Sequence, residues 1–213
     1  MKYLNRNESI LKMATGKCVL HLGAVGFTDL EVSDRVKNFK KTLHYKLSAI
    51  ADVIGVDYSA NVIRELEKVN ITNIKYGDVE KLQDLNIEGK FDLIIIGDLI
   101  EHLSNPGLML EGIKRFCDEN TIILITTPNA FGLPNIIRYL INRFKEGEEH
   151  VIGFNFFNIS NLLKRYQLQV QTMATCYQDK ATSYGLFFHG GKLFFNCFPK
   201  LGGTIFLLVK LGL

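Results

Sequence analysis

The sequence predicts a doubly wound α/β domain with a mostly parallel, seven-stranded sheet and helices on both of its faces. Short apolar segments alternate with helical patterns as far as Asn129, as expected when each strand is followed by a crossover helix. The segment FDLIIIGD, residues 91–98, is apolar almost throughout. Such a run is typical of a central parallel strand that is covered on both sides.

Five strands are predicted in the first part of the chain, over residues 17–23, 52–59, 73–78, 91–98 and 121–129. The first is rich in β-formers and stops at a glycine. The second leads into SANVIRELEKV, whose apolar spacing predicts an amphipathic helix capped by Ser59. A further helix is expected to begin near NPG and to end at IKRFC.

The pattern changes after Pro128. NIIRYLINRFK and ISNLLKRY read as helices, and residues 168–175 and 202–210 are the sixth and seventh predicted strands. The connection between those two strands is rich in phenylalanine. We expect one domain, residues 1–213, in which segments of about 131–153 and 183–200 lie outside the regular alternation of strands and helices.

Composition indicates a globular, cytosolic protein. Of its 213 residues, 47% are hydrophobic and 22% are charged, and the net charge is +3. This charge is too small to favour nucleic acid as a partner. The four cysteines lie far apart in the sequence, which favours reduced thiols over a disulfide frame or a zinc site. Composition leaves the oligomeric state open.

The ends of the chain carry no membrane-spanning signal. The first 16 residues lack the apolar core of a signal peptide. The apolar C-terminal region is broken by Lys192, Lys200 and Lys210, well short of the ~20 residues that a span needs. We expect a buried final strand, with a surface-lying tail in weak peripheral membrane contact as the alternative.

Polar residues end each predicted strand. The first strand ends in GAVG, the next three end in Asp57, Asp78 and Asp98, and the fifth ends in TPN. Ligands of open α/β sheets bind at this carboxyl edge. A glycine turn lets the backbone approach a ligand closely, and a carboxylate at the second strand can accept both hydroxyls of a ribose. The alternative for Asp57 and Asp78 is that they cap helices or turns.

The glycine pattern argues against two common nucleotide sites. One G-x-x-G pair stands where a dinucleotide fingerprint needs G-x-G-x-x-G, and Asp57 follows Gly23 by 34 positions rather than about 20. No G-K-[ST] follows the glycines, so the sequence has no P-loop here. An adenosine-containing cofactor without a pyrophosphate clamp fits the pattern better.

The motifs resemble those of the class I S-adenosylmethionine-dependent methyltransferases. The resemblance covers roughly residues 17 to 175 and is carried by VLHLGAVGF, IGVDYS, YGDVEKL and ILITTPN. The segment FDLIIIGDLIEHLSNPG is the most specific of the motifs. EEHVIGFNFFNISNLLKRYQLQV is similar to a stretch in the small-molecule and glycan branch of the family.

The resemblance implies a Rossmann-like fold, S-adenosylmethionine as cofactor and a small-molecule acceptor. It assigns the ribose to Asp57 and the adenine amine to Asp78, backed by Val79. The full expected cofactor-binding set is Gly23, Ala24, Val25, Gly26, Asp57, Tyr58, Asp78, Val79, Asp98 and Leu99.

The first motif departs from the family pattern. His21 replaces its aspartate, and Val25 and Phe27 replace two of its glycines. Gly26 is therefore expected to adopt the positive φ, one position later than usual. We interpret His21 as a strand-end residue that satisfies nearby backbone.

Methyl transfer to a hydroxyl benefits from a base, and histidine titrates near neutral pH. His150 and His102 are the candidate catalytic residues, with a lid contact and a structural link as their respective alternatives. Asp98, Glu101 and His102 resemble the metal-binding run of ubiquinone-type O-methyltransferases. Because the Glu-His pair also occurs widely in methyltransferases without a metal role, we expect no metal.

The resemblance implies that the segments of about 131–153 and 183–200 cover the substrate. Arg138, Arg143 and Lys145 lie in or beside the first of these segments. They can receive a phosphate or carboxylate of the acceptor, or act as solvated helix charges. Two other functions stay open: a methyltransferase-like binding module without catalysis, and an NAD-dependent oxidoreductase.

Overall fold

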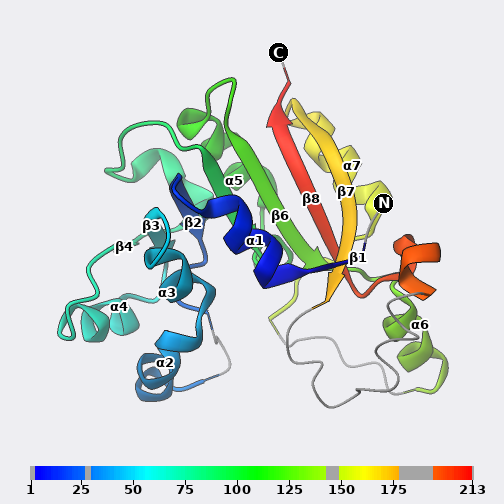
Figure 1. The fold of residues 1–213 in the computed structure, drawn as a ribbon, viewed down its shortest axis with the longest axis horizontal. Helices are drawn as coiled ribbons and strands as arrows, with labels where there is room; N and C mark the ends of the chain where they lie inside the picture. Colours follow the sequence, from blue (N-terminus) through cyan, green and yellow to red (C-terminus); the bar gives the residue numbers. More distant parts are fainter. Residues whose placement is uncertain (1–2, 27–29, 143–148, 178–193, 213) are drawn as a thin grey trace.

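A computed structural model describes residues 3–26, 30–142, 149–177 and 194–212. They form one eight-stranded sheet with helices packed against both faces (Figure 1). The strands are β1 Tyr3–Asn5, β2 Cys18–Leu22, β3 Asp52–Asp57, β4 Ile74–Tyr76, β5 Leu93–Gly97, β6 Ile122–Pro128, β7 Leu168–Tyr177 and β8 Thr204–Leu211.

The helices are α1 Arg6–Ala14, α2 Val32–Asn38, α3 Leu43–Ser48, α4 Ala60–Glu67, α5 Pro106–Gly112, α6 Leu133–Leu140 and α7 Phe156–Arg165. Four helices, α4 to α7, lie in the segments that the sequence predicts to be helical, whereas α1, α2 and α3 lie outside those segments. Short 3₁₀ turns include η2 Val79–Asp84 after β4 and η3 Ile100–His102 after β5.

The sheet order is β1-β7-β8-β6-β5-β2-β3-β4. The strands β2 to β6 pair in parallel, whereas β8 runs antiparallel to both of its neighbours, β6 and β7. The chain leaves β2 toward β3 and β4, and later leaves β5 toward β6 on the other side. The order of strands therefore reverses between β2 and β5, the position at which open α/β sheets bind ligands.

Alternate side chains of the strands contribute to two apolar layers, one on each face of the sheet. Leu20 and Ile94 pack with the residues of α5 and α7, whereas Val19 and Ile95 pack with α1 and α3. Because successive residues of a strand point to opposite faces, continuously apolar strands bury both sides. The predicted fold class is confirmed.

Two details differ from the prediction. The sheet has eight strands rather than seven, because the three-residue β1 pairs in parallel with the end of β7 and is too short to show a period in sequence. Ser59 stands at the N-cap position of α4 but makes no capping hydrogen bond. Its Oγ instead accepts a hydrogen bond from Arg35 Nη2 at 3.0 Å.

The last strand is buried rather than lying on a surface. Ile205, Leu207 and Val209 of β8 are fully covered, as the sequence predicts. Among the described residues, no helix is long and apolar enough to cross a bilayer. The four cysteines are all free.

Candidate active site

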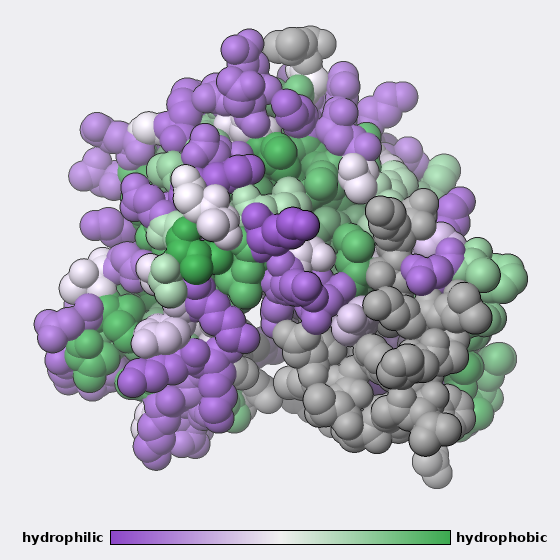
Figure 2. Space-filling model, viewed as in Figure 1, coloured by the Kyte–Doolittle hydropathy of each residue, from purple (hydrophilic) through white to green (hydrophobic). Residues whose placement is uncertain are grey.

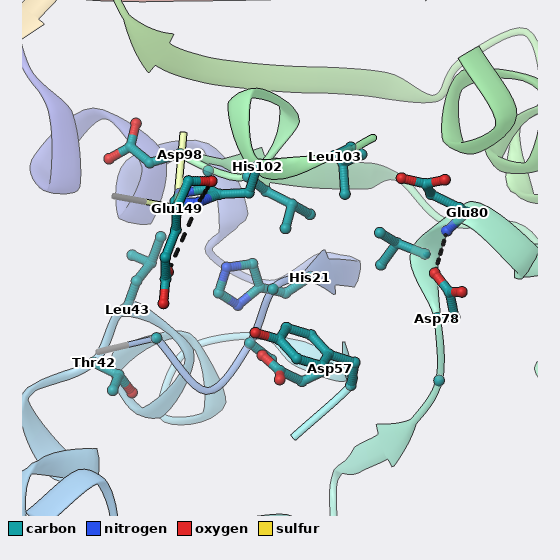
Figure 3. Close-up of a pocket in the computed structure, with 18 of the residues that line it drawn as sticks. His21, Thr42, Leu43, Asp57, Asp78, Glu80, Asp98, His102, Leu103 and Glu149 are labelled. Carbon is teal, nitrogen blue, oxygen red and sulfur yellow. Dashed lines mark hydrogen bonds and ion pairs between the residues drawn. The ribbon is translucent and has the colours of Figure 1, made fainter. Parts of the chain in front are cut away.

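A cavity of about 1130 Å³ opens at the carboxyl ends of β2, β3, β4 and β5 (Figure 3). Its volume is ample for a nucleoside cofactor and a small acceptor together. Figure 3 shows Asp78 on one side of the pocket and Asp98 on the other, with Asp57 and His21 between them. The acids that end successive strands therefore share one cavity, as the sequence predicts.

The glycine loop after β2 turns back onto β3. Gly23 and Gly26 have φ values of +74° and +62°, which glycine adopts without the strain of a Cβ. The amides of Gly23 and Ala24 donate to the carbonyl of Val56 at 2.9 and 3.2 Å. The expected positive φ of Gly26 is confirmed, whereas Phe27 lies outside the described residues.

Asp57 is held rigidly at the end of β3. It is 5% exposed, and its Oδ2 accepts from the Val25 amide at 2.9 Å while its Oδ1 accepts from the Ser59 amide at 3.0 Å. A carboxylate has about four acceptor sites. Two backbone contacts thus orient Asp57 and leave capacity for hydroxyl groups in the cavity that it lines.

Asp78 has the capping role that the sequence left open, and it also lines the cavity. Its side chain accepts from the Glu80 amide at 2.9 Å, at the start of η2. Lys81 Nζ lies 3.8 Å from its other oxygen, and half of the Asp78 side chain is exposed. Val79, next in the chain, is buried and lines the same cavity.

Asp98 follows β5 in a left-handed conformation, with φ +50°. Thr126 Oγ1 donates to its Oδ1 at 2.9 Å, and Arg6 Nη2 lies 3.3 Å from its Oδ2. The next residue, Leu99, packs against the loop, since a Cβ on Gly23 would lie 3.3 Å from Leu99 Cδ1. Space as well as φ therefore favours glycine at position 23.

The two candidate catalytic histidines lie together. The rings of His102 and His150 meet edge to face, with centroids 4.8 Å apart. His102 Nδ1 is 3.2 Å from the carbonyl oxygen of Glu149. Burial lowers the pKa of His102, and the neighbouring His150 lowers it further. His102 lines the cavity, whereas His150 is not among the lining residues.

Glu101 lies behind these histidines and is 2% exposed. Its Oε2 accepts from Thr127 Oγ1 at 2.9 Å, and within the described chain its Oε1 has no hydrogen-bond partner. Burial raises the pKa of Glu101 to about 8. Three possible metal-ligating atoms lie within 4.8 Å of one another, one each from Glu101, His102 and His150. Carboxylate and imidazole groups are chemically able to hold a metal ion.

A family model described as a methyltransferase domain matches residues 38–181 of this sequence. The chain belongs to this methyltransferase family. No curated protein gives a significant match.

Solved structures place the methyltransferase in the same fold. A SAM-dependent methyltransferase from Archaeoglobus fulgidus is 15% identical with a TM-score of 0.57, covering 96% of this chain and 94% of that one. One from Mesorhizobium loti is 12% identical with a TM-score of 0.59, covering 95% and 94%. The magnesium protoporphyrin IX methyltransferase of Synechocystis PCC 6803, solved with bound SAH, is 12% identical with a TM-score of 0.54, covering 95% and 80%. The Rossmann-like fold and the enzyme class predicted from sequence are confirmed, and S-adenosylmethionine is the cofactor that they support.

The methyltransferase cavity contains nearly all of the predicted cofactor residues. Val25 is the exception: it is fully buried, and its amide instead orients Asp57. Arg6, Lys46 and Glu149 also line the cavity but were not predicted as site residues. Arg6 and Lys46 lie outside the motifs, and only the packing of distant segments brings them to the site, whereas Glu149 directly precedes His150 in the EEHV motif.

His21 of the methyltransferase has a different partner from the one expected. Its Nδ1 faces Nδ1 of His44 at 3.2 Å, and the two rings stack. Burial lowers the pKa of both, that of His44 to about 4. The two neutral rings therefore form a buried pair, of which His21 lines the cavity.

Proposed function

We propose that this methyltransferase transfers the methyl group of S-adenosylmethionine to a hydroxyl of a small molecule, such as a sugar, a glycan precursor or a secondary metabolite. The observation that carries the hydroxyl assignment is the position of His102 on the wall of the cavity. A neutral imidazole on the wall of the cofactor cavity is suited to accept the proton that an alcohol or phenol must lose.

The residues present fit an adenosine-containing cofactor. We assign the ribose hydroxyls to Asp57, whose carboxylate is already oriented by two backbone amides. We assign the amine of adenine to Asp78, which lies on the side of the cavity opposite Asp98 (Figure 3). The loop 23–26, with Tyr58, Val79 and Leu99, completes the proposed cofactor wall.

When bound, S-adenosylmethionine supplies a methyl group on a positively charged sulfur, which needs no further activation. The task of the protein is to hold donor and acceptor in line and to exclude water. We propose no metal, and we assign His102, the member of the Glu101–His102–His150 set that lines the cavity, to base work instead.

His102 is oriented for base work. Because a carbonyl can only accept, the contact with the Glu149 oxygen requires the proton on Nδ1, so Nε2 carries the lone pair. A lowered pKa keeps this ring neutral at pH 7. His150 packs against His102 and is the second candidate for the same role.

We further propose that the segments of about 131–153 and 183–200 cover the acceptor. Glu149, in the first of them, lines the cavity, whereas residues 183–193 lie outside the described residues. Arg138 of α6 is exposed and is not among the lining residues, which favours a solvated charge there. Arg143 and Lys145 lie outside the described residues.

Weak peripheral membrane contact was expected as an alternative for the C-terminal tail, whose strand β8 is buried, and we propose the exposed part of α6 as its site instead. Ile137, Tyr139 and Leu140 are exposed, and Figure 2 shows hydrophobic side chains at the edge where Figure 1 places α6. The proposal includes a cytosolic location, supported by the four free cysteines, and no nucleic-acid partner.

Calorimetry with S-adenosylhomocysteine and with NAD tests this function. We expect the wild-type protein to bind S-adenosylhomocysteine and Asp57→Ala to bind it roughly 10- to 100-fold more weakly, because ribose hydroxyls lose a charged acceptor. Asp52→Ala is the matched control, since Asp52 is exposed at the opposite end of β3. Binding of NAD alone indicates an oxidoreductase, and binding of neither indicates a non-catalytic module.

A further inference from the structure

The helix α6 lies at the carboxyl edge of the sheet and presents apolar side chains to solvent. It begins shortly after β6 ends, and Figure 1 shows it beyond the arrowhead of that strand. None of its residues is buried, although its sequence LPNIIRYL has the apolar face of a helix that packs on another surface. Ile137 is 48% exposed and Leu140 is 78% exposed.

A second group of exposed apolar side chains adjoins α6. Phe194 and Phe198 are 39% and 55% exposed, and their ring centroids lie 5.0 Å apart. The chain that follows them is tied to the start of α6, because Asn129 Nδ2 donates to the carbonyl oxygens of Lys200 and Gly202 at 3.0 and 2.8 Å. We name the exposed apolar residues of both segments the α6 surface: Ile137, Tyr139, Leu140, Ile141, Phe194 and Phe198.

The charged residues of these two segments are all basic. Residues 131–142 and 194–203 contain Arg138 and Lys200 and no Asp or Glu, although the whole chain has 22 acidic residues. Arg138 and Lys200 are both exposed. A bilayer of anionic lipids is complementary to such a surface, because it takes up apolar side chains and attracts Lys and Arg to its headgroups. A second copy of the same surface would bring like charges together, which disfavours self-association.

We propose that the α6 surface docks this protein on a bilayer rich in anionic lipid. The inference rests on the proposed function and deepens its membrane contact, since it names the charge of the lipid and adds the segment of Phe194 and Phe198. The cavity lies at the same edge of the sheet as α6, because β6 pairs with β5 and Thr126 of β6 donates to Asp98. Docking through α6 therefore turns the edge at which the cavity opens toward the lipid headgroups.

The first test uses a single fluorophore. The sequence contains no tryptophan, so one introduced indole reports its own surroundings. With vesicles of equal parts phosphatidylcholine and phosphatidylglycerol, we expect the emission of Leu140→Trp to shift to shorter wavelength and to be quenched by brominated lipid. Val69→Trp is the control, since Val69 is 56% exposed near the end of α4, and its emission is expected to stay unchanged.

The second test removes the apolar side chains and measures flotation with the same vesicles. We expect Ile137→Ser/Leu140→Ser to weaken vesicle binding at least about tenfold, because less apolar area enters the bilayer. Leu108→Ser is the matched control. Leu108 is an exposed apolar residue on α5, and its loss is expected to leave vesicle binding unchanged.

The third test removes the basic side chains. Each Lys or Arg near an anionic surface strengthens binding about fivefold, so Arg138→Gln/Lys200→Gln is expected to bind the mixed vesicles roughly 10- to 25-fold more weakly. Wild type is expected to bind phosphatidylcholine alone more weakly by about the same factor. Lys12→Gln, which removes an exposed charge from α1, is the control and leaves binding unchanged.

Three results overturn the proposal: no vesicle binding by wild type, equal binding to the two lipid compositions, or full binding by the apolar and basic double variants. Self-association of wild type that Ile137→Ser/Leu140→Ser abolishes, without vesicle binding, also overturns it, because the occupant is then a second copy. Calorimetry with S-adenosylhomocysteine on the same proteins shows that the variants are folded. Failure of wild type to bind S-adenosylhomocysteine contradicts the proposed function, an outcome distinct from a loss of vesicle binding.

Discussion

The base role that we propose for His102 depends on one ring nitrogen. The Glu149 carbonyl holds the ring proton on Nδ1, and the lowered pKa keeps the imidazole neutral near pH 7. The second ring nitrogen, Nε2, lies 4.0 Å from Oε1 of Glu101, and a neutral ring is able to act there as a base, whereas a protonated ring is not. The assignment is therefore testable by rate measurements.

For His102→Gln we expect a fall in kcat of roughly 10²- to 10⁴-fold with a hydroxyl acceptor, and unchanged binding of S-adenosylhomocysteine. In wild type, kcat/KM is expected to rise with pH as His102 loses its proton, through a pKa below 6.5. A metal chelator is expected to leave turnover unchanged. A screen of sugars and phenols supplies the acceptor for these assays. A normal kcat in the variant assigns the base role elsewhere, first to His150.

The buried carboxyl of Glu101 is expected to make the free energy of unfolding depend on pH. Its pKa rises from 4.5 to about 8 on folding, so between these pH values the unfolded chain ionises while the folded chain keeps the proton. The free energy of unfolding therefore falls as pH rises, by at most about 1.4 kcal/mol per pH unit from this group. Glu101→Gln removes that slope. Parallel denaturation curves for the two proteins from pH 5 to 8 contradict this expectation.

At the scale of elements, the strands that carry strong patterns were predictable and the segments without a pattern were not. Continuous apolar runs such as β5 have a composition and a length that indicate a strand covered on both faces. β1 has three residues, and its position depends on pairing with residues about 170 positions later. The local sequence around β1 therefore does not predict this long-range pairing.

The same distinction holds for the site. Asp57, Asp78 and Asp98 were predictable because each lies at or just after the end of a strand, and strand ends meet at one edge. Arg6 reaches this edge through long-range packing, and the His21–His44 contact depends on how α3 lies on the sheet. These contacts depend on tertiary structure, so the expected backbone role of His21 was wrong.

Gly55 in β3 allows α3 to approach the sheet. A Cβ at this position would lie 2.6 Å from Ala24 Cβ and 2.7 Å from His44 Cε1. We expect Gly55→Ala to lower the free energy of unfolding by about 1–3 kcal/mol through overpacking. Gly153→Ala is the control, since its Cβ would meet Ala130 Cβ at an ordinary 3.6 Å. Equal stability of the two variants by chemical denaturation contradicts this account.

For the whole molecule, the buried histidine pair predicts sensitivity to acid. Below pH 6.5 the unfolded chain takes up a proton at His44, which the folded chain accepts only near pH 4. The contribution of His44 to the free energy of unfolding therefore falls as pH falls, by at most about 1.4 kcal/mol per pH unit. His44→Gln removes this contribution, so its stability approaches or passes that of wild type toward pH 4.5. A constant difference between the two proteins from pH 7 to 4.5 speaks against it.

The position of β8 has a consequence for synthesis. β7 touches the rest of the sheet through β8, which lies between β7 and β6, and β1 pairs with β7. On the ribosome, β7 emerges before the strand with which it must pair. The strands β2 to β6 are thus able to pair before residues 204–211 are synthesised, whereas β7 is not able to join the sheet until then. The edge that anchors β1, and with it the approach of Arg6 to the cavity, is completed last.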